Sequence, residues 1–294
     1  MGLLTSNWLR ATTRSLRQNN PRMYARLNGI RNRILSRETG LAAYQASALR
    51  KFRSRCLRSA AGKRVLEIGS DPNGRVLRQL SKWGVSEAVG VNPAKEMWAS
   101  SGTDRQIAER ARLRRADARA LPFDDASFDA IFSIATFEHI LELPKALAEM
   151  HRVLRSGGYL YANFGPIWSG CRGHHLRVQV GEREFRHFRP DSNPLPDYCH
   201  LLMSRTELRD ALTNRLAAPY VEPIVTWVFD DPGINRWFHH QYLEAFSASA
   251  FNIVSVRSER DRLDEQLDRV LRFRYPQESA FDVTNVEVVL SKQR

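Results

Sequence analysis

Histidine side chains gather in one irregular stretch of the chain, about residues 165–203, which is also rich in arginine and proline. A neutral imidazole accepts a proton near neutral pH, so histidine is well suited to act as a general base. The adjacent His174 and His175 are the first candidates for this role, with His139 and His200 behind them. The stretch therefore predicts acid–base chemistry or direct contact with a substrate.

Two other interpretations of these histidines stay open. They can form a hydrogen-bonded structural pair, or His174 and His175 can bind a metal ion together with Asp197 or His200. We expect neither a structural metal centre nor a disulfide framework, because the cysteines are few, far apart and without a C-x-x-C pair. They are Cys56, Cys171 and Cys199. A reducing, cytoplasmic location fits this cysteine usage best.

Short apolar runs alternate with amphipathic stretches from residue 64 onward. Residues 128–134 are almost wholly apolar, as expected of a buried parallel strand, and the amphipathic stretch 143–154 ends at Ser156-Gly157-Gly158. Such alternation predicts a doubly wound α/β sheet that binds ligands at the carboxyl ends of its strands. The other elements are expected as strands at 64–69, 88–91, 113–116 and 159–164, and as helices at 75–83, from about 93, and at 204–213.

Three motifs follow one another between residues 117 and 158. Residues 117–129 read DARALPFDDASFD, residues 137–139 read FEH, and residues 149–158 read EMHRVLRSGG. In this order they resemble motifs of the class I S-adenosylmethionine-dependent methyltransferases of the small-molecule type. The resemblance implies a seven-stranded, mostly parallel Rossmann-like sheet, closed by an antiparallel pair at 251–256 and 283–290. It also implies S-adenosyl-L-methionine as the cofactor.

The same resemblance assigns residues to the cofactor. The loop after the first strand approaches the methionine part, where Glu67 orders the loop or meets the ammonium group and Gly69 allows close approach of the backbone. Asn92 takes the place of the acid that binds the ribose hydroxyls. Asp117 and the backbone amide of Ala118 take the place of the adenine contact. The predicted cofactor-binding set is completed by Ser70, Gly74 and Ser133.

The loop departs from the family pattern at two positions and the ribose contact at a third. Asp71 and Asn73 stand where the family loop usually has glycines, although Gly74 follows one position late. The charge of Asp71 would repel the carboxylate of the cofactor unless the side chain turns away or pairs. Asn92 offers neutral hydrogen bonds in place of charge-assisted ones. A methyltransferase-like binding protein without turnover is therefore the alternative function.

In the resembled family, the residues that follow the fifth strand shape the acceptor pocket; here they are the insert at about 165–203. Methyl transfer depends mainly on positioning, and an oxygen acceptor must also lose a proton. The resemblance and the histidines together favour O-methylation of a small-molecule acceptor. The catalytic candidates are His174, His175 and His139.

Positive charge is concentrated at the N-terminal end of the sequence. The chain holds 45 Lys and Arg against 32 Asp and Glu, a net charge of +13, yet residues 1–64 alone carry fifteen basic residues and one acid. The remaining residues are close to neutral, so no nucleic-acid partner is expected, and an RNA methyltransferase is the least favoured alternative. We divide the chain into a basic helical arm at 1–60 and a methyltransferase domain at 61–294.

The basic arm has apolar residues at helical spacing from Trp8 to about Arg58, interrupted at Pro21 and Gly40. This pattern predicts two or three helices with cationic faces. The arm can cap the domain, lie on an anionic membrane surface, act as a transit peptide or carry an acyl group at Gly2. We expect neither a secretory signal nor a membrane-spanning helix, because no apolar run is long enough. The sequence does not predict the oligomeric state.

Overall fold

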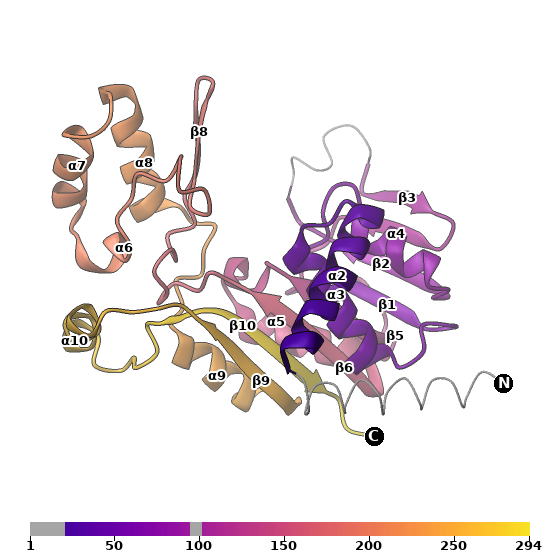
Figure 1. The fold of residues 1–294 in the computed structure, drawn as a ribbon. Coiled ribbons are helices and arrows are strands. Elements are labelled where there is room, and N and C mark those ends of the chain that lie inside the picture. The colour runs from indigo at the N-terminus through magenta and orange to yellow at the C-terminus, as the bar shows by residue number, and fades with distance from the viewer. Residues whose placement is uncertain (1–20, 95–101) are drawn as a thin grey trace. The chain divides into compact units, whose positions relative to one another are not determined.

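The structure, a computed structural model, describes residues 21–94 and 102–294 (Figure 1). The chain divides into two compact units, Met1–Arg58 and Ser59–Arg294. The part of the predicted arm before residue 21 and most of the helix predicted from about residue 93 lie outside the described residues.

The first unit contains two helices, α2 (Pro21–Thr39) and α3 (Ala43–Phe52), and then a π-helical turn, η1 (Arg53–Leu57). Proline suits the first position of α2 because it has no backbone N–H and its φ is already helical. Gly40 follows the helix with a φ of 68°, the left-handed conformation that commonly ends helices. The predicted helical arm is confirmed in the described part. Its contact with a membrane, or its role as a cap, stays a prediction.

The second unit is built on one eight-stranded sheet, in the order β3-β4-β2-β1-β5-β6-β10-β9 (Figure 1). The strands are β1 (Arg64–Ile68), β2 (Glu87–Val91), β3 (Asp104–Ala108), β4 (Ala111–Arg114), β5 (Phe128–Ile134), β6 (Leu154–Phe164), β9 (Asn252–Arg260) and β10 (Val283–Ser291). Its helices are α4 (Arg75–Lys82), α5 (Leu143–Val153), α9 (His239–Ala248) and α10 (Glu265–Arg274).

Five neighbouring strands, β4, β2, β1, β5 and β6, run parallel, and β10 pairs antiparallel with both β6 and β9. This arrangement confirms the predicted doubly wound sheet and its antiparallel closing pair. The count of seven strands was one short, because β3 adds an antiparallel edge strand beside β4. Its sequence, DRQIA, is largely polar and exposed, so it lacks the apolar run that marks the central strands.

Aromatic packing fixes the loop that follows β5. Phe137 begins a short 3-10 turn, η3 (Phe137–His139), and its ring lies 5.4 Å from that of Phe164 at the end of β6. Phe164 in turn packs against Tyr242 of α9 with ring centroids 4.9 Å apart. All three aromatic side chains are buried, so the turn that carries His139 rests on the main core.

The residues after β6 form an insert with an apolar core of its own. A hairpin of β7 (Arg177–Val180) and β8 (Arg183–Arg186) is followed by α6 (Cys199–Leu202), α7 (Arg205–Thr213) and α8 (Ala218–Asp230). Figure 1 shows these elements together, apart from the sheet. Their buried side chains form one cluster that includes Leu176, Phe185, Leu208, Leu212, Ile224 and Val228. The insert therefore extends beyond the predicted 165–203, because α7 and α8 bury their apolar faces against the hairpin.

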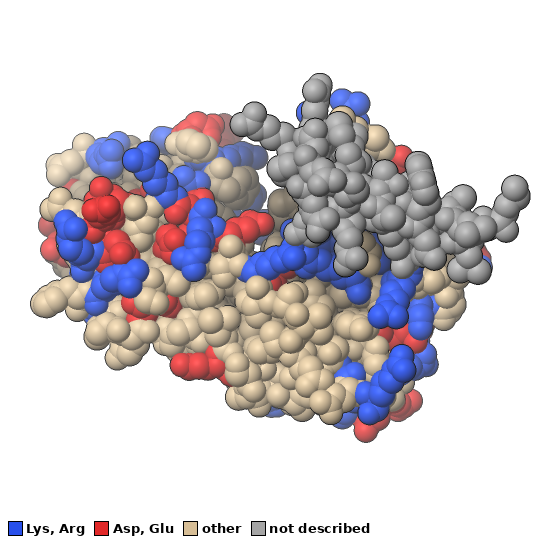
Figure 2. Space-filling view, turned by 60° about the horizontal axis from the view of Figure 1, so that its bottom comes forward, with Lys and Arg blue, Asp and Glu red and all other residues tan. Residues whose placement is uncertain are grey.

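Charged side chains of both signs are interspersed over α10 and the insert, at the left of Figure 2. Ion pairs account for part of this pattern: Arg272 bonds Asp268 at 2.7 Å on α10, and Arg205 bonds Asp230 between α7 and α8. Within the described residues, none of the helices has the length and apolar character needed to cross a bilayer.

Candidate functional site

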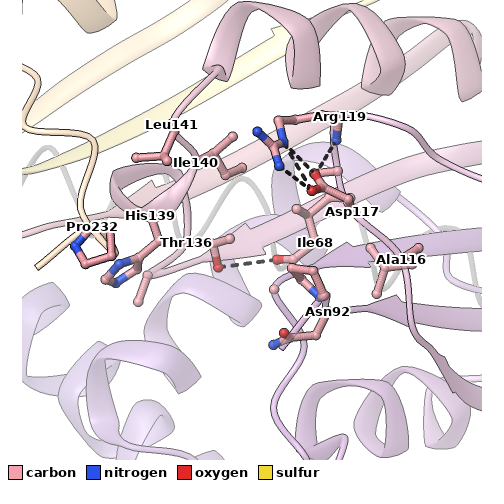
Figure 3. Close-up of a pocket in the computed structure, with 15 residues that line it drawn as sticks. Ile68, Asn92, Ala116, Asp117, Arg119, Thr136, His139, Ile140, Leu141 and Pro232 are labelled. Atoms are coloured by element: carbon pink, nitrogen blue, oxygen red, sulfur yellow. Dashed lines mark hydrogen bonds and ion pairs between the residues drawn. The ribbon is translucent and has the colours of Figure 1, made fainter. Parts of the chain in front are cut away.

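A pocket of about 360 Å³ opens at the carboxyl ends of β4, β2, β1 and β5 (Figure 3). Ligands of open α/β sheets bind at this edge, where the strand order reverses between β1 and β5. Residues from four strand ends, the loop after β5 and the loop after α8 line it. They are Ile68, Gly69, Val91, Asn92, Pro93, Ala116, Asp117, Ala118, Arg119, Ala135, Thr136, His139, Ile140, Leu141 and Pro232.

Gly69 lines the pocket with its backbone, directly after β1. Its φ of 82° favours glycine, and a Cβ at this position would collide with the side chain of Thr136. Thr136 is fixed in turn because its hydroxyl donates to the carbonyl oxygen of Ile134 at 2.8 Å. The residue after the first strand therefore presents partly exposed backbone to the pocket beside a polar side chain.

Asn92 lies at the end of β2, with both ends of its amide in use. Its Nδ2 donates to the carbonyl oxygen of Ser70 at 3.0 Å, and its Oδ1 accepts from the backbone N–H of Ala94 at 2.9 Å. The side chain thus joins the loops after β1 and β2.

Asp117 also lines the pocket, but Arg119 engages its carboxylate. The guanidinium donates from Nη2 at 2.7 Å and from Nε at 3.0 and 3.1 Å, and the backbone N–H of Arg119 adds a bond at 2.9 Å. These side-chain bonds lower the pKa of Asp117, although burial opposes them. Arg119 also bonds Glu142 at 2.7 Å, so one arginine joins two carboxylates at the pocket rim.

Four predicted cofactor residues are buried and do not line the pocket: Glu67, Ser70, Gly74 and Ser133. Glu67 accepts from the Ser70 hydroxyl at 2.6 Å, and the Ser133 hydroxyl donates to the carbonyl oxygen of Ile68 at 3.1 Å. Burial raises the pKa of Glu67 to about 8. Its carboxyl group is therefore neutral at pH 7 in this structure.

Gly74 and Asp71 shape the start of α4. Gly74 has a φ of 55°, and a Cβ there would collide with Ile107 of β3. The Asp71 carboxylate accepts from the backbone N–H groups of Asn73 at 2.9 Å and Arg75 at 3.0 Å. It therefore turns toward the N-terminal end of the helix and is not among the residues lining the pocket.

His139 is the predicted catalytic histidine that lines the pocket, where it lies beside Pro232 (Figure 3). Its Nδ1 lies 2.6 Å from the carbonyl oxygen of Gly233. Because a carbonyl oxygen only accepts, Nδ1 carries a proton, and in the neutral form of the ring the lone pair lies on Nε2. No group in the described part of the chain bonds that nitrogen.

His174 and His175 lie deeper, within the insert. His174 Nδ1 accepts from the N–H of Leu176 at 3.1 Å, and His175 bonds the carbonyl oxygen of Pro166. The ring of His175 packs edge-on against that of His139, with centroids 5.2 Å apart. Burial lowers the pKa of His175 to about 3 and that of His174 well below its usual value. His200 is similar, with a pKa of about 4.

The described residues contain no group of three or more His, Cys, Asp or Glu side chains arranged to hold a metal ion. His200 contacts the carbonyl oxygen of Trp168 at 2.8 Å, and its ring lies against that of His174. The histidines of the insert thus form a ring-packed cluster, each with backbone partners. Their catalytic role remains a prediction.

Several pocket residues were not predicted from the sequence. Thr136, Arg119 and Leu141 lie within or beside the recognised motifs, so their place after a strand end could have marked them. Pro232 comes from the loop after α8, more distant in sequence than any other lining residue. No local pattern marks it.

A family model described as "Methyltransferase domain" matches residues 66–162, the part of the chain that supplies nearly all of the pocket. Residues 66–162 form a methyltransferase domain. The recognised resemblance and the predicted cofactor, S-adenosyl-L-methionine, are thereby confirmed.

Two curated relatives are similar to parts of this chain. A demethylmenaquinone methyltransferase of Thermus thermophilus is 35% identical over 40% of this chain and 54% of its own length. The O-methyltransferase cnsE of Penicillium expansum is 33% identical over 35% of this chain and 38% of its own length. The chain thus spans about half or less of the length of these relatives. A crystal structure of an S-adenosylmethionine-dependent methyltransferase from Mesorhizobium loti aligns over 84% of this chain and 96% of its own, with 17% identity and a TM-score of 0.48.

The residues of the pocket fit the cofactor of this family. Gly69 lines the pocket without a side chain, and Asn92 and Asp117 place polar groups at two neighbouring strand ends. Ile68, Val91 and Ile140 add apolar surface, as needed to hold a purine ring. The negative charge of Asp71 is directed at α4, so the sequence departure at that position puts no carboxylate into the pocket.

Proposed function

We propose that this chain is an S-adenosylmethionine-dependent methyltransferase that methylates a hydroxyl group of a small, largely apolar acceptor, with His139 as general base. The observation that carries the proposal is the state of the His139 ring. Its Nδ1 is bound to the Gly233 carbonyl oxygen at 2.6 Å, which leaves Nε2 as the basic nitrogen. A hydroxyl acceptor must lose its proton during methyl transfer and so requires such a base, whereas a carbon or sulfur acceptor depends on one less.

The surroundings of His139 support an apolar acceptor. Ile140, Leu141 and Pro232 line the same pocket next to the imidazole, and the side chain of Leu141 is half exposed. Apolar walls with a few polar groups are typical of pockets for small organic ligands. One relative is named for demethylmenaquinone and the other as an O-methyltransferase, and both names favour a small-molecule acceptor.

In the proposed reaction, bound S-adenosylmethionine supplies an activated methyl group, and Gly69, Asn92 and Asp117 would hold it. His139 Nε2 takes the proton from the hydroxyl group of the acceptor. The Gly233 carbonyl oxygen, bound to Nδ1–H, stabilises the positive charge that this transfer places on the ring.

The test combines binding and turnover. Calorimetric titration with S-adenosylmethionine and with its demethylated product measures cofactor affinity, and a panel of small phenols and aliphatic alcohols measures methyl transfer. H139N should lose roughly a hundredfold to ten-thousandfold in kcat with cofactor affinity unchanged, because only the base is removed. H151N, a partly buried histidine of α5 that packs on Phe251, is the matched control. Absence of cofactor binding at high micromolar concentration contradicts the proposal.

The alternative, a methyltransferase-like binding protein, is supported by the state of two pocket residues. Both ends of Asn92 are engaged, and the Asp117 carboxylate already accepts four bonds from Arg119. A carboxylate has about four acceptor sites, so an adenine amine would compete with the arginine. R119A should then tighten cofactor binding without producing turnover, whereas turnover in the wild-type protein rejects this alternative.

A further inference from the structure

Asn235, outside the methyltransferase motifs, joins the end of the insert to the turn that carries His139. Its Nδ2 donates to the carbonyl oxygens of Phe137 at 2.9 Å and Ile140 at 3.2 Å. Its backbone N–H donates to the carbonyl oxygen of Glu138 at 2.9 Å. One asparagine therefore holds three of the four carbonyl oxygens of residues 137–140, a segment that includes the catalytic candidate.

The orientation of the Asn235 amide is fixed by its partners. Its Oδ1 accepts from the Tyr242 hydroxyl at 2.7 Å and from the backbone N–H of Trp237 at 3.2 Å. A backbone N–H only donates and a carbonyl oxygen only accepts, so a flipped amide would place like groups together on both sides. Neither an aspartate nor an apolar side chain can make these four bonds.

The same segment supplies the acceptor for His139. Gly233 lies two residues before Asn235, and its carbonyl oxygen lies 2.6 Å from His139 Nδ1. The Gly233 N–H in turn donates to Asp231 Oδ1 at 3.1 Å, which closes a small turn. Pro232 of this turn lines the pocket beside the imidazole (Figure 3). Asn235 thus keeps in place the carbonyl oxygen that decides which ring nitrogen of His139 carries the proton.

We propose that Asn235 is a positioning residue that holds His139 in the Nδ1–H form, with Nε2 free to act as base. The functional part of this inference rests on the proposed role of His139. The structural part, the ring state of one histidine, is independent of any reaction. The hydrogen bonds of Asn235 thus connect the segment after the insert to the turn that carries His139, and so influence which ring nitrogen is basic.

A purely structural role for Asn235 makes a different prediction. If the amide only stabilises the loop, its loss lowers the stability of the protein but leaves the His139 ring as it is. Asn193 offers a matched comparison, because it is another asparagine of the insert that both donates, to the His187 carbonyl oxygen at 3.3 Å, and accepts, from the Leu195 N–H at 3.2 Å. It is not among the residues that line the pocket.

The experiment uses the full chain labelled with ¹⁵N in its histidine rings. Two-dimensional NMR at about pH 8.5, where an ordinary imidazole is neutral, distinguishes a protonated from an unprotonated ring nitrogen. The His139 signal is assigned by its loss in H139N. The wild-type protein and N193A should show Nδ1–H, whereas N235A should show a mixture or the Nε2–H form that free imidazole side chains prefer in water.

Turnover gives the second readout. In N235A, kcat should fall roughly tenfold to a hundredfold, while the Kd for the demethylated cofactor stays within about twofold. Y242F, which removes only the hydroxyl that holds Asn235 Oδ1, should show a smaller change of the same kind and serves if N235A does not fold. An unchanged His139 ring state in N235A and Y242F, or an equal change in N193A, overturns the inference. Absence of turnover in the wild-type protein concerns the proposed function alone, since the ring state is measured without it.

Discussion

Glu67 combines a buried position with a single hydrogen-bonded partner. Only 2% of the residue is exposed, and its one hydrogen bond in the described structure is accepted from the Ser70 hydroxyl at 2.6 Å. Burial raises its pKa from 4.5 to about 8, against the effect of the hydroxyl. A carboxyl group that is neutral at pH 7 can ionise when a cation binds beside it. Glu67 would therefore have to lose its proton before it could pair with an ammonium group.

Replacing Glu67 by Gln should stabilise the protein at alkaline pH and leave it unchanged in acid. The folded pKa of about 8 lies above the ordinary value of 4.5, so the stability of the wild-type protein is fully present below 4.5 and lost as the pH rises towards 8. Gln does not titrate. E67Q should therefore gain roughly 4 kcal/mol over the wild type at pH 8 and almost nothing at about pH 4.5.

Urea unfolding of both proteins at the two pH values measures the difference. E244Q, at an exposed position of α9, is the control and should follow the wild type at both. Parallel stability curves for E67Q and the wild type would show that the buried carboxyl group is ionised in the folded protein.

Among the elements, the central strands could be predicted and the insert largely could not. The strands at β1 and β5 are short apolar runs buried on both faces, and burial of that kind leaves a pattern in the sequence. Helix α8 has a proline in its first turn and another, Pro223, inside it, which reads as an interruption. The strands β7 and β8 have four residues each, too few for a period to emerge.

Some of the pocket residues could likewise be predicted from the sequence, and others could not. The family resemblance predicts Gly69, Asn92, Asp117 and Ala118, and the search for a general base predicts His139. The structure brings all five to one pocket, because the carboxyl ends of parallel strands meet at one edge of the sheet. Glu67, Ser70 and Ser133 lie beneath it, because side chains alternate along a strand and near its end only some reach the edge. Pro232 and Asn235 arrive through the tertiary fold of the insert, which no local spacing encodes.

The start of helix α4 allows a test of the altered glycine-rich loop. D71A should lower the free energy of unfolding by about 1 kcal/mol, because the carboxylate accepts from the Asn73 and Arg75 N–H groups at the helix start. Cofactor affinity should not change, because Asp71 does not line the pocket. Thermal unfolding and calorimetric titration measure the two quantities. D71N, which keeps one acceptor without the charge, should lose less stability, and tighter cofactor binding in either variant would mean that the charge does reach the cofactor.

For the whole molecule, the concentration of charge in residues 1–64 predicts binding to anionic membranes. Fifteen basic residues and one acid lie there, while the rest of the chain is close to neutral. Co-sedimentation should show binding to vesicles with about a third phosphatidylserine, no binding to pure phosphatidylcholine, and loss of binding between roughly 0.1 and 0.5 M salt. Equal partition to both vesicle types, or none to either, would contradict electrostatic binding of the arm to anionic membranes.

The buried histidines of the insert should lower the stability of the folded protein at acid pH, whereas Glu67 lowers it at alkaline pH. Burial lowers the pKa of His175 to about 3 and that of His200 to about 4, below the ordinary 6.5. Their contribution to the free energy of unfolding is therefore complete above pH 6.5 and is lost as the pH falls towards 4. In this range the histidines of the unfolded chain are protonated, whereas those of the folded insert are not. Hydrogen exchange should show α8 and the β7–β8 hairpin opening at pH 5 while β5 stays protected.

His200→Gln tests this loss of stability in acid at one site, because a glutamine can still donate to the Trp168 carbonyl oxygen that His200 contacts at 2.8 Å. The difference in free energy of unfolding between H200Q and the wild type should shift in favour of H200Q by about 2 kcal/mol when the pH falls from 8 to 5. H240Q is the control, since His240 lies outside the cluster, beside Glu278. If H200Q and the wild type lose stability equally on acidification, protonation of His200 does not limit the stability of the insert.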